Sequence, residues 1–456
     1  MPVALIDSLG CTEAMAELFS DLSILRAMLD FEVALARAEA KVGIIPQTAA
    51  EAIAAAADPS AFDTSALSRD ALRAGTPSIP LVKRLTEIVR SKNESAAGFV
   101  HYGATSQDVS DTALVLLLKR AQVLIGADFQ STEHSLWAIS QKHKDTIMLG
   151  RTLLQPAPPI TLGLKAAGWC GAIRRGGERL SAEFRNALLL QFGGAVGTLA
   201  ALGDRGPAVA EQLASELGLP CPDAPWHTHR DRLAGLACAC GVVTGSLGKV
   251  ARDISLLMQS EVGEAAEPDS PGRGGSSTMP HKRNPIGCAV TISAAQRVPG
   301  LVSAYLSGMV QEHERAVGGI QSEWSTLAGI TQLTGLAAAT IAEIAGGLSV
   351  DSERMTQNIT QTRGTIYAEK ATMLLAAKLG RDMAHRLLDH ASKQAFLQKR
   401  SLPDVLAEMP EMAKHLDRDA LRQLGDAESY LGSSEFFRQR LLQPSSVAPA
   451  KPAKLD

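Results

Sequence analysis

The chain has 456 residues, of which 45% are hydrophobic, 20% charged and 4% aromatic. This composition excludes a largely disordered protein, and the length suggests two or three domains or one elongated scaffold. Lys and Arg number 45 against 48 Asp and Glu, for a formal charge of -3. No overall basic field is available for nucleic acid or a membrane surface, so any anion site must be local.

The cysteines and the first residues bear on the cellular compartment. Six cysteines occur without a C-x-x-C pair, and the N-terminal residues lack the basic start and apolar core of a signal peptide. We expect neither a zinc site nor a disulfide framework, and a cytoplasmic protein with no membrane partner.

Apolar residues with a period of three to four predict long helices along most of the chain. The first is expected over Glu13–Ile45, and Gly75–Pro80 interrupts the pattern before a second helical stretch. Long rods are predicted for Asp111–Lys144, with Asp111 and Thr112 as the cap, and for Arg230–Glu264. Segments 161–190 and 286–350 are also helical by composition, with Pro299 expected to bend the latter.

Helices of this length need several neighbours to bury a wide apolar stripe, so they predict a helix bundle and an oligomer. Almost no segment alternates as a strand would, and the expected fold class is all-α. The predicted division is an N-terminal helical domain (1–110), a central helix-bundle domain (111–350), a C-terminal helical domain (351–443) and a disordered tail (444–456).

Residues 271–286 carry the clearest chemical signal. Gly272, Gly274 and Gly275 form a hinge, and Asn284 followed by Pro285 is typical of an N-cap and a first helical position. A helix N-terminus would then face the loop and help to bind an anion.

Two hydroxyls and a cation lie in the same loop. Ser276 and Ser277 stand near Lys282, and a serine can move a carbon-bound proton only if cations and amides stabilise its alkoxide. The loop therefore predicts proton transfer beside an anionic group.

The run Gly275-Ser-Ser-Thr-Met-Pro-His-Lys-Arg-Asn-Pro285 resembles the signature loop of the fumarase/aspartase superfamily. The resemblance implies homotetramers with a core of twenty long helices, active sites shared between subunits, and addition or elimination beside a carboxylate without a metal or other cofactor. It implies that Ser276, or alternatively Ser277, carries the proton, and that Lys282 and Asn284 hold the developing dianion.

Two further segments are similar to superfamily motifs. Residues 101–112 and 150–163 would bind substrate carboxylates, and a third segment, placed on a helix after the loop, would contact an extra carboxylate. The residues assigned to substrate binding in these three segments are His101, Thr105, Ser106, Arg151, Thr152, Gln155, His313 and Arg315. His227 and His229 lie before a rod, and the sequence does not decide their role.

Two departures distinguish branches of the superfamily. Adenylosuccinate lyases have a catalytic histidine where this chain has Leu153, and a second histidine near Gly75–Lys83, where this chain has none. An aliphatic side chain cannot move a proton, so that chemistry is put in doubt.

At both positions the chain resembles the bacterial 3-carboxy-cis,cis-muconate cycloisomerases, and it also resembles them at residues 311–315, 321–324 and 362–385. Where that family usually has a tryptophan, this chain has Gly319-Ile320. The resemblance covers roughly residues 10 to 395 and implies lactonisation, in which a substrate carboxylate is itself the nucleophile. The alternatives are an adenylosuccinate-lyase-type elimination and a non-catalytic scaffold.

Overall fold

A computed structural model describes residues 6–269, 274–275, 279, 282–414 and 424–443. Ser276, Ser277 and the predicted tail 444–456 lie outside this set. The chain divides into two compact units, each made of three stretches of sequence. The first unit comprises Met1–Gln130, Arg175–Lys249 and Ala289–Ile341, and the second comprises Ser131–Arg174, Val250–Cys288 and Ala342–Asp456.

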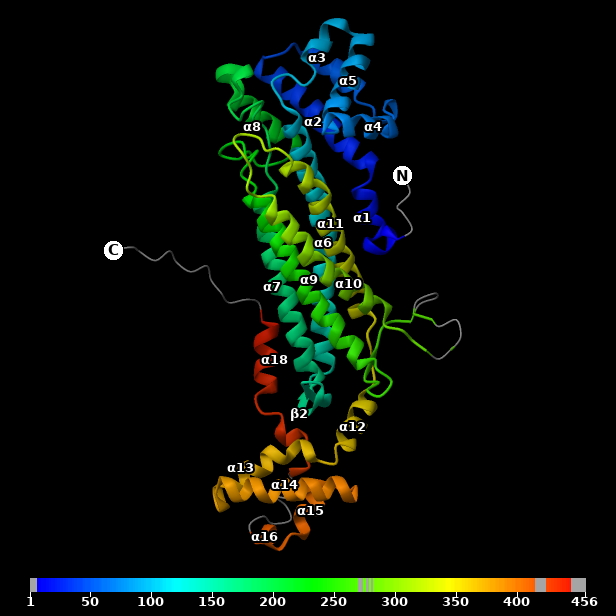
Figure 1. The fold of residues 1–456 in the computed structure, drawn as a ribbon, viewed down its shortest axis with the longest axis vertical. Coiled ribbons are helices and arrows are strands. Elements are labelled where there is room, and N and C mark those ends of the chain that lie inside the picture. The colour runs from blue at the N-terminus through cyan, green and yellow to red at the C-terminus, as the bar shows by residue number, and fades with distance from the viewer. Residues whose placement is uncertain (1–5, 270–273, 276–278, 280–281, 415–423, 444–456) are drawn as a thin grey trace, which may run out of the picture. The chain divides into compact units, whose positions relative to one another are not determined.

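Helices dominate the described residues, which confirms the all-α prediction. Five long helices have residues in both units (Figure 1): α6 (Ser106–Lys142), α7 (Leu162–Ala187), α9 (Asp231–Leu257), α10 (Ile286–Ser307) and α11 (Gly319–Gly346). Their buried faces are lined by Leu, Val, Ile and Ala at helical spacing, as expected for a bundle.

The first unit also contains more than half of the shorter helices found among the described residues. They are η1 (Asp7–Gly10), α1 (Glu13–Leu18), α2 (Asp21–Val42), α3 (Gln47–Ala56), η2 (Pro59–Ala61), α4 (Thr64–Ala74), α5 (Ser78–Lys92), η3 (Glu94–Phe99), η4 (Ala200–Arg205) and α8 (Gly206–Leu217). Helix α2 packs against both α3 and α8.

The second unit combines two small sheets with short helices. Strands β1 (Ile147–Thr152) and β2 (Gln155–Thr161) form an antiparallel hairpin, and β3 (Ala265–Ala266) pairs with β4 (Ser349–Val350). The helices are α12 (Ser352–Gln361), η5 (Thr365–Tyr367), α13 (Ala368–Leu379), α14 (Arg381–Gln398), α15 (Leu402–Glu408), α16 (Pro410–Ala413), η6 (Glu428–Tyr430) and α18 (Ser434–Leu442). Leu375, Leu388 and Leu406 belong to one apolar cluster of this unit.

Three predicted helix boundaries are wrong, and hydrogen bonds explain two of them. The first helix is broken into α1 and α2, because the Ser20 hydroxyl accepts a bond from the Ser23 amide and caps α2. Helix α6 begins at Ser106, so Asp111 and Thr112 are not its cap; the Thr112 hydroxyl donates to the carbonyl of Gln191 instead. Segment 286–350 forms two helices, α10 and α11, joined by a non-helical connection.

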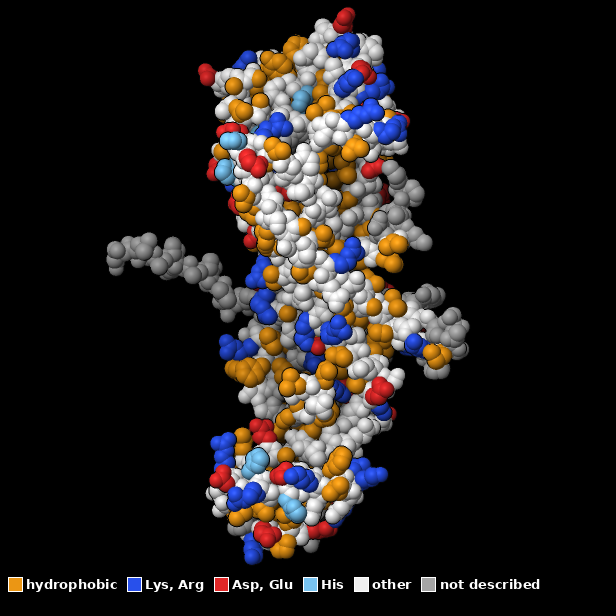
Figure 2. Space-filling view, in the orientation of Figure 1, with side chains coloured by type: hydrophobic (Ala, Val, Ile, Leu, Met, Phe, Trp, Pro, Cys, Tyr) orange, Lys and Arg blue, Asp and Glu red, His pale blue; other side chains and the backbone are white. Residues whose placement is uncertain are grey.

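Two described helices, α9 and α11, are long and apolar enough to cross a membrane by length and composition alone. In each, 56% of the apolar window is buried inside the protein, as in core helices of a bundle. On the face seen in Figure 2, Lys and Arg side chains are interspersed with Asp and Glu, in keeping with the near-neutral charge of the sequence.

Candidate active site

Three predicted substrate-binding residues meet in the first unit. Arg315 donates from Nη1 to the Thr105 hydroxyl at 2.6 Å and from Nη2 to the Ser106 hydroxyl at 3.1 Å. Thr105 directly precedes α6, and Ser106 is its first residue. A guanidinium beside two hydroxyls and the start of a long helix forms a site suited to a carboxylate.

Arg315 lies on the connection between α10 and α11, residues 308–318. The prediction that this segment is helical is wrong. His313 is in the same connection with a φ of 50°. At one end, Gln311 donates to the carboxylate of Glu323 at 2.8 Å. The connection is therefore anchored to α11 just before it reaches Thr105.

Glu323 belongs to a buried ionic cluster. Arg230 forms two bonds with Asp111, at 2.8 and 2.9 Å, and also binds Glu323. The Tyr305 hydroxyl donates to Glu323 at 2.9 Å. Because both carboxylates share Arg230 and Glu323 also accepts from Tyr305, this cluster fixes α6, α10 and α11 around the connection that carries Arg315.

Asp108 organises the segment that precedes α6. Its carboxylate accepts bonds from the backbone amides of Thr105, Gly193 and Gly194 at 2.9 to 3.0 Å. The His227 Nε2 lies 2.7 Å from the same carboxylate, and the His227 side chain is only 4% exposed. His227 therefore points into the protein interior. Among the described residues, His229 makes a hydrogen bond only through its backbone amide, to the carbonyl of Trp226.

His101, also predicted to bind substrate, pairs with a residue that sequence reasoning missed. Its Nδ1 lies 2.7 Å from Oε1 of Glu32 on α2. Glu32 and Glu39 occur on the apolar face of α2 and are 1% and 0% exposed. Both glutamates could have been noticed in the sequence, because a charged residue among the apolar positions of an amphipathic helix is unusual.

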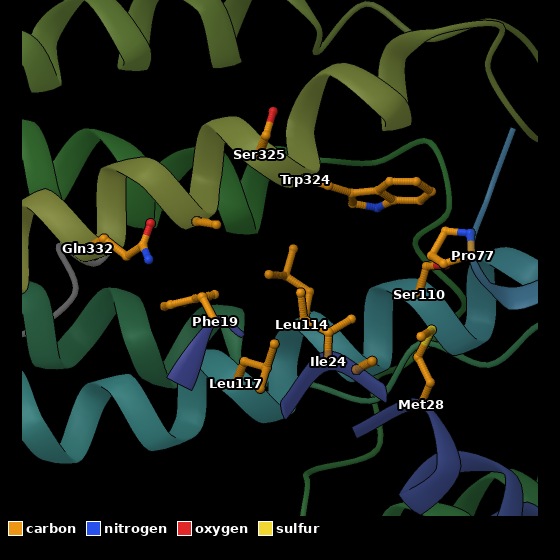
Figure 3. A pocket seen from close by; sticks show the side chains of 12 residues that line it. Phe19, Ile24, Met28, Pro77, Ser110, Leu114, Leu117, Trp324, Ser325 and Gln332 are labelled. Atoms are coloured by element: carbon orange, nitrogen blue, oxygen red, sulfur yellow. The ribbon is translucent and has the colours of Figure 1, made fainter. Parts of the chain in front are cut away.

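An apolar pocket with a volume of about 400 Å³ lies between α2, α6 and α11 in the same unit. Figure 3 shows Trp324, Pro77 and Ser110 at one end of it and Gln332 at the other. The buried indole N–H of Trp324 has no partner among the described residues. Ser110 donates to the backbone carbonyl of Ser106 at 3.0 Å, so the pocket begins one turn beyond the Arg315 cluster.

In the second unit, Arg151 binds a carboxylate of the protein itself. Its Nη1 and Nη2 donate to the two oxygens of Glu264 at 2.9 and 2.6 Å, and Asn358 donates to Glu264 at 2.7 Å. Arg151, which the sequence assigns to substrate binding, thus makes its two parallel bonds to Glu264, which is 0% exposed. A substrate role for Arg151 remains a prediction.

Thr152 and Gln155 face each other across the end of the β1–β2 hairpin. The turn between them is Leu153-Leu154, with φ values of 50° and 64° and side chains that are 97% and 75% exposed. Two positive φ values define a turn that normally selects Asn and Gly. Leu153, the position that distinguishes the branches of the superfamily, therefore points into solvent.

The predicted helix N-terminus after the signature loop is occupied. Helix α10 begins at Ile286, and the amides of Gly287 and Cys288 donate to the carboxylate of Glu267 at 3.0 and 2.7 Å. The helix N-terminus that was expected to help bind an anion from the loop is therefore already bound to Glu267. The N-terminus of α10 does bind an anion, but this anion is the carboxylate of Glu267.

Asn284 closes the base of the loop instead of capping the helix. Its backbone amide and its side-chain Nδ2 both donate to the carbonyl of Gly274, at 2.9 and 3.1 Å. Gly274 has a φ of 65°, and a Cβ there would lie 2.6 Å from the Asn284 carbonyl oxygen, so glycine is required. Lys282 is exposed.

The described residues hold no group of three or more His, Cys, Asp or Glu side chains arranged to bind a metal ion. The sites instead present guanidinium, hydroxyl and amide groups. Such groups bind carboxylates and stabilise negative charge that develops during a reaction.

A family model described as "Lyase" matches residues 10–300, and one described as "Adenylosuccinate lyase C-terminus" matches residues 364–441. The chain therefore belongs to this lyase family, the fumarase/aspartase superfamily that the signature loop predicts.

Its relatives define the branch. A protein of Bradyrhizobium diazoefficiens is 47% identical over 94% of this chain and 95% of its own length, and one of Pseudomonas aeruginosa is 46% identical over 96% and 95%. Both are named 3-carboxy-cis,cis-muconate cycloisomerase. The crystal structure of the 3-carboxy-cis,cis-muconate lactonizing enzyme from Pseudomonas putida matches with a TM-score of 0.90 and 46% identity, covering 96% of this chain and 98% of that one.

Proposed function

We propose that this chain is an intramolecular lyase that converts 3-carboxy-cis,cis-muconate to 4-carboxymuconolactone. The observation that carries the proposal is the 46 to 48% identity to cycloisomerases of that name over more than nine-tenths of the chain. The Arg315–Thr105–Ser106 cluster suits a substrate with several carboxylates.

In this reaction one carboxylate of the substrate adds to a double bond conjugated with another carboxylate. Because the substrate supplies the nucleophile, the enzyme needs no base to generate it. The reaction is therefore compatible with Leu153 at the position where adenylosuccinate lyases have a histidine. Charge then accumulates on the carbon beside the second carboxylate and spreads into it. Ser276, or alternatively Ser277, delivers the proton while Lys282 and Asn284 stabilise the dianion.

Substrate binding is assigned to side chains from both units. His101, Thr105, Ser106, His313 and Arg315 belong to the first unit, and Arg151, Thr152 and Gln155 to the second. An assembly that shares its active sites between subunits would combine such sets. We therefore include in the proposal a homotetramer with a twenty-helix core, built from three-domain subunits.

The proposal also covers the setting of the reaction. It places the protein in the cytoplasm, in the protocatechuate branch of aromatic degradation, with no cofactor. The substrate is a small polycarboxylate.

The second candidate function is an adenylosuccinate-lyase-type elimination, which the match of residues 364–441 to the C-terminal model of that family brings into consideration. Leu153 and the absence of histidine from residues 75–83 count against it. Restoring histidine with Leu153→His would favour this alternative only if fumarate release from adenylosuccinate then appeared.

The discriminating experiment is an absorbance assay. Purified protein is mixed with 3-carboxy-cis,cis-muconate, whose conjugated diene is lost on lactonisation, and with adenylosuccinate in parallel. We expect loss of diene absorbance and no reaction with the purine. Turnover of adenylosuccinate alone would overturn the proposal, and turnover of neither would favour a scaffold role.

A further inference from the structure

A buried carboxylate holds the first residue of the predicted substrate-binding set. Glu32 Oε1 lies 2.7 Å from His101 Nδ1, and the Glu32 side chain is inaccessible to solvent while that of His101 keeps 17% of its surface exposed. The imidazole is thus held from inside through one ring nitrogen. Its other nitrogen, Nε2, makes no hydrogen bond within the described residues.

The charge balance of this pair favours a cationic imidazole. Oε2 of Glu32 has no hydrogen-bond partner among the described residues, and His101 is the only group that Glu32 pairs with there. A buried carboxylate without an arginine or lysine is costly unless its partner carries positive charge. Burial alone would lower the pKa of His101, but Glu32 and the more distant Asp108 outweigh it and raise that pKa.

The other titratable groups that face this pair are few. Glu39 lies two turns further along α2, is fully buried, and has no partner for either oxygen among the described residues. Burial, reinforced by Glu32, raises the pKa of Glu39 to about 9, so this carboxyl is neutral at pH 7. From α6, Asp108 is already bound by three backbone amides and His227.

The backbone around His101 is also unusual. His101 has a φ of 59°, in the left-handed region that non-glycine residues rarely adopt. Four residues later, the Thr105 amide is fixed by Asp108 and the Thr105 hydroxyl by Arg315. Strained residues held by their surroundings often occur at functional sites.

We propose that Glu32 is a positioning residue that orients His101 and keeps its imidazole cationic, so that His101 and Arg315 together bind the carboxylates of the substrate. This inference rests on the proposed function, since it assigns a role within the same site. It adds a residue of α2 that makes no contact with substrate and acts through His101.

The first test measures the protonation of His101 without using activity. Hydrogen–deuterium exchange at histidine C2, read by mass spectrometry of peptides, gives a pKa for each histidine in the full-length protein. Glu32→Gln keeps the size and the hydrogen-bonding ability of the side chain but removes its charge. We expect the His101 pKa to be lower in Glu32→Gln than in the wild type.

Glu39→Gln is the matched control. It makes the same chemical change on the same helix, in an equally buried position, but replaces a carboxyl that is already neutral. We expect Glu39→Gln to leave the His101 pKa at its wild-type value. An equal shift in both variants would show that the packing of α2, not the charge of Glu32, sets the pKa, and would overturn the inference.

The second test asks whether the substrate uses the charge. Loss of a cation that binds a carboxylate is expected to raise KM for 3-carboxy-cis,cis-muconate about tenfold at pH 7, with a smaller change in kcat. The basic limb of the kcat/KM profile should also move to lower pH in Glu32→Gln and not in Glu39→Gln. A merely structural role for Glu32 would lower thermal stability without moving that limb.

The outcomes separate this inference from the proposed function. An unchanged His101 pKa in Glu32→Gln overturns the inference whatever substrate the enzyme turns over, as does a lowered pKa with unchanged KM and pH profile. If the wild type fails to turn over 3-carboxy-cis,cis-muconate while the exchange experiment gives the expected shift, the substrate assignment fails and the Glu32–His101 pairing is retained.

Discussion

Arg315 donates a 2.6 Å hydrogen bond to the hydroxyl of Thr105, a residue 210 positions earlier in the chain. A second bond to Ser106 fixes the plane of the guanidinium. Both hydroxyls lie at the start of α6, so a carboxylate bound there is held by a cation, two hydroxyls and a helix N-terminus.

Arg315→Met is therefore expected to lower kcat/KM for the triacid by about 100-fold, because bonds to a charged group are lost. Arg315→Lys keeps the charge but not the planar fork and should lose less. Steady-state kinetics check this, with Arg84→Met as a control. Arg84 is half exposed and, within the described part of the chain, its one ion pair is with Glu87 on its own helix. Equal activity in Arg315→Met and Arg84→Met would contradict the assignment.

Glu267 stabilises the first turn of α10 through the amides of Gly287 and Cys288. Glu267→Ala should lower the free energy of unfolding by about 1 to 2 kcal/mol, the usual effect of removing a helix cap. Glu267→Gln retains an acceptor and should cost less. Urea denaturation measures both, and equal stability of all three proteins would show that these amides do not need the carboxylate.

The Leu153-Leu154 turn combines two positive φ values with two apolar side chains that are mostly exposed. Leu153→Asn with Leu154→Gly supplies the residues that such a turn prefers and should raise stability by about 1 to 2 kcal/mol. Because the turn joins Thr152 and Gln155, kcat/KM should fall in the same variant. Calorimetry and kinetics together test this; higher stability with full activity would remove the turn from the site.

Glu39 gives a prediction for the pH dependence of stability. Its pKa is raised to about 9 in the folded protein by burial and by Glu32, against an ordinary value of 4.5. The folded state therefore holds a proton that the unfolded state releases between these values, and the stability is full below pH 4.5 and declines as pH rises toward 9.

Glu39→Gln removes this titration. Its free energy of unfolding should be close to that of the wild type at pH 5 and exceed it increasingly toward pH 8, by up to about 1 kcal/mol per pH unit. Urea denaturation across this range is the measurement. Parallel curves for the two proteins would show that Glu39 is not neutral in the fold.

The long helices could be predicted because their apolar spacing is local information. The starts of α6 and α10 could not, since the groups that fix them come from distant sequence: Asp108 is held by Gly193 and Gly194, and the first amides of α10 are bound by Glu267. The β1–β2 hairpin was missed for a different reason. Pro156, Pro158 and Pro159 mask the pattern of β2 and are tolerated because the sheet has only two strands.

The site was predictable in part. The residues of the Arg315 cluster follow from the resemblance to the superfamily, but no local pattern reveals that Arg315 meets Thr105 or that Arg151 is paired with Glu264. Glu32 was open to detection as a charge on the buried face of α2. Its partner was not, because 69 residues separate it from His101.

Incubation of the purified protein with 3-carboxy-cis,cis-muconate in deuterium oxide, followed by proton NMR of the product, tests the proposed lactonisation and its proton delivery in one step. We expect 4-carboxymuconolactone carrying one deuterium on the carbon next to a carboxylate. Unchanged triacid, alongside fumarate release when adenylosuccinate is supplied instead, would contradict it.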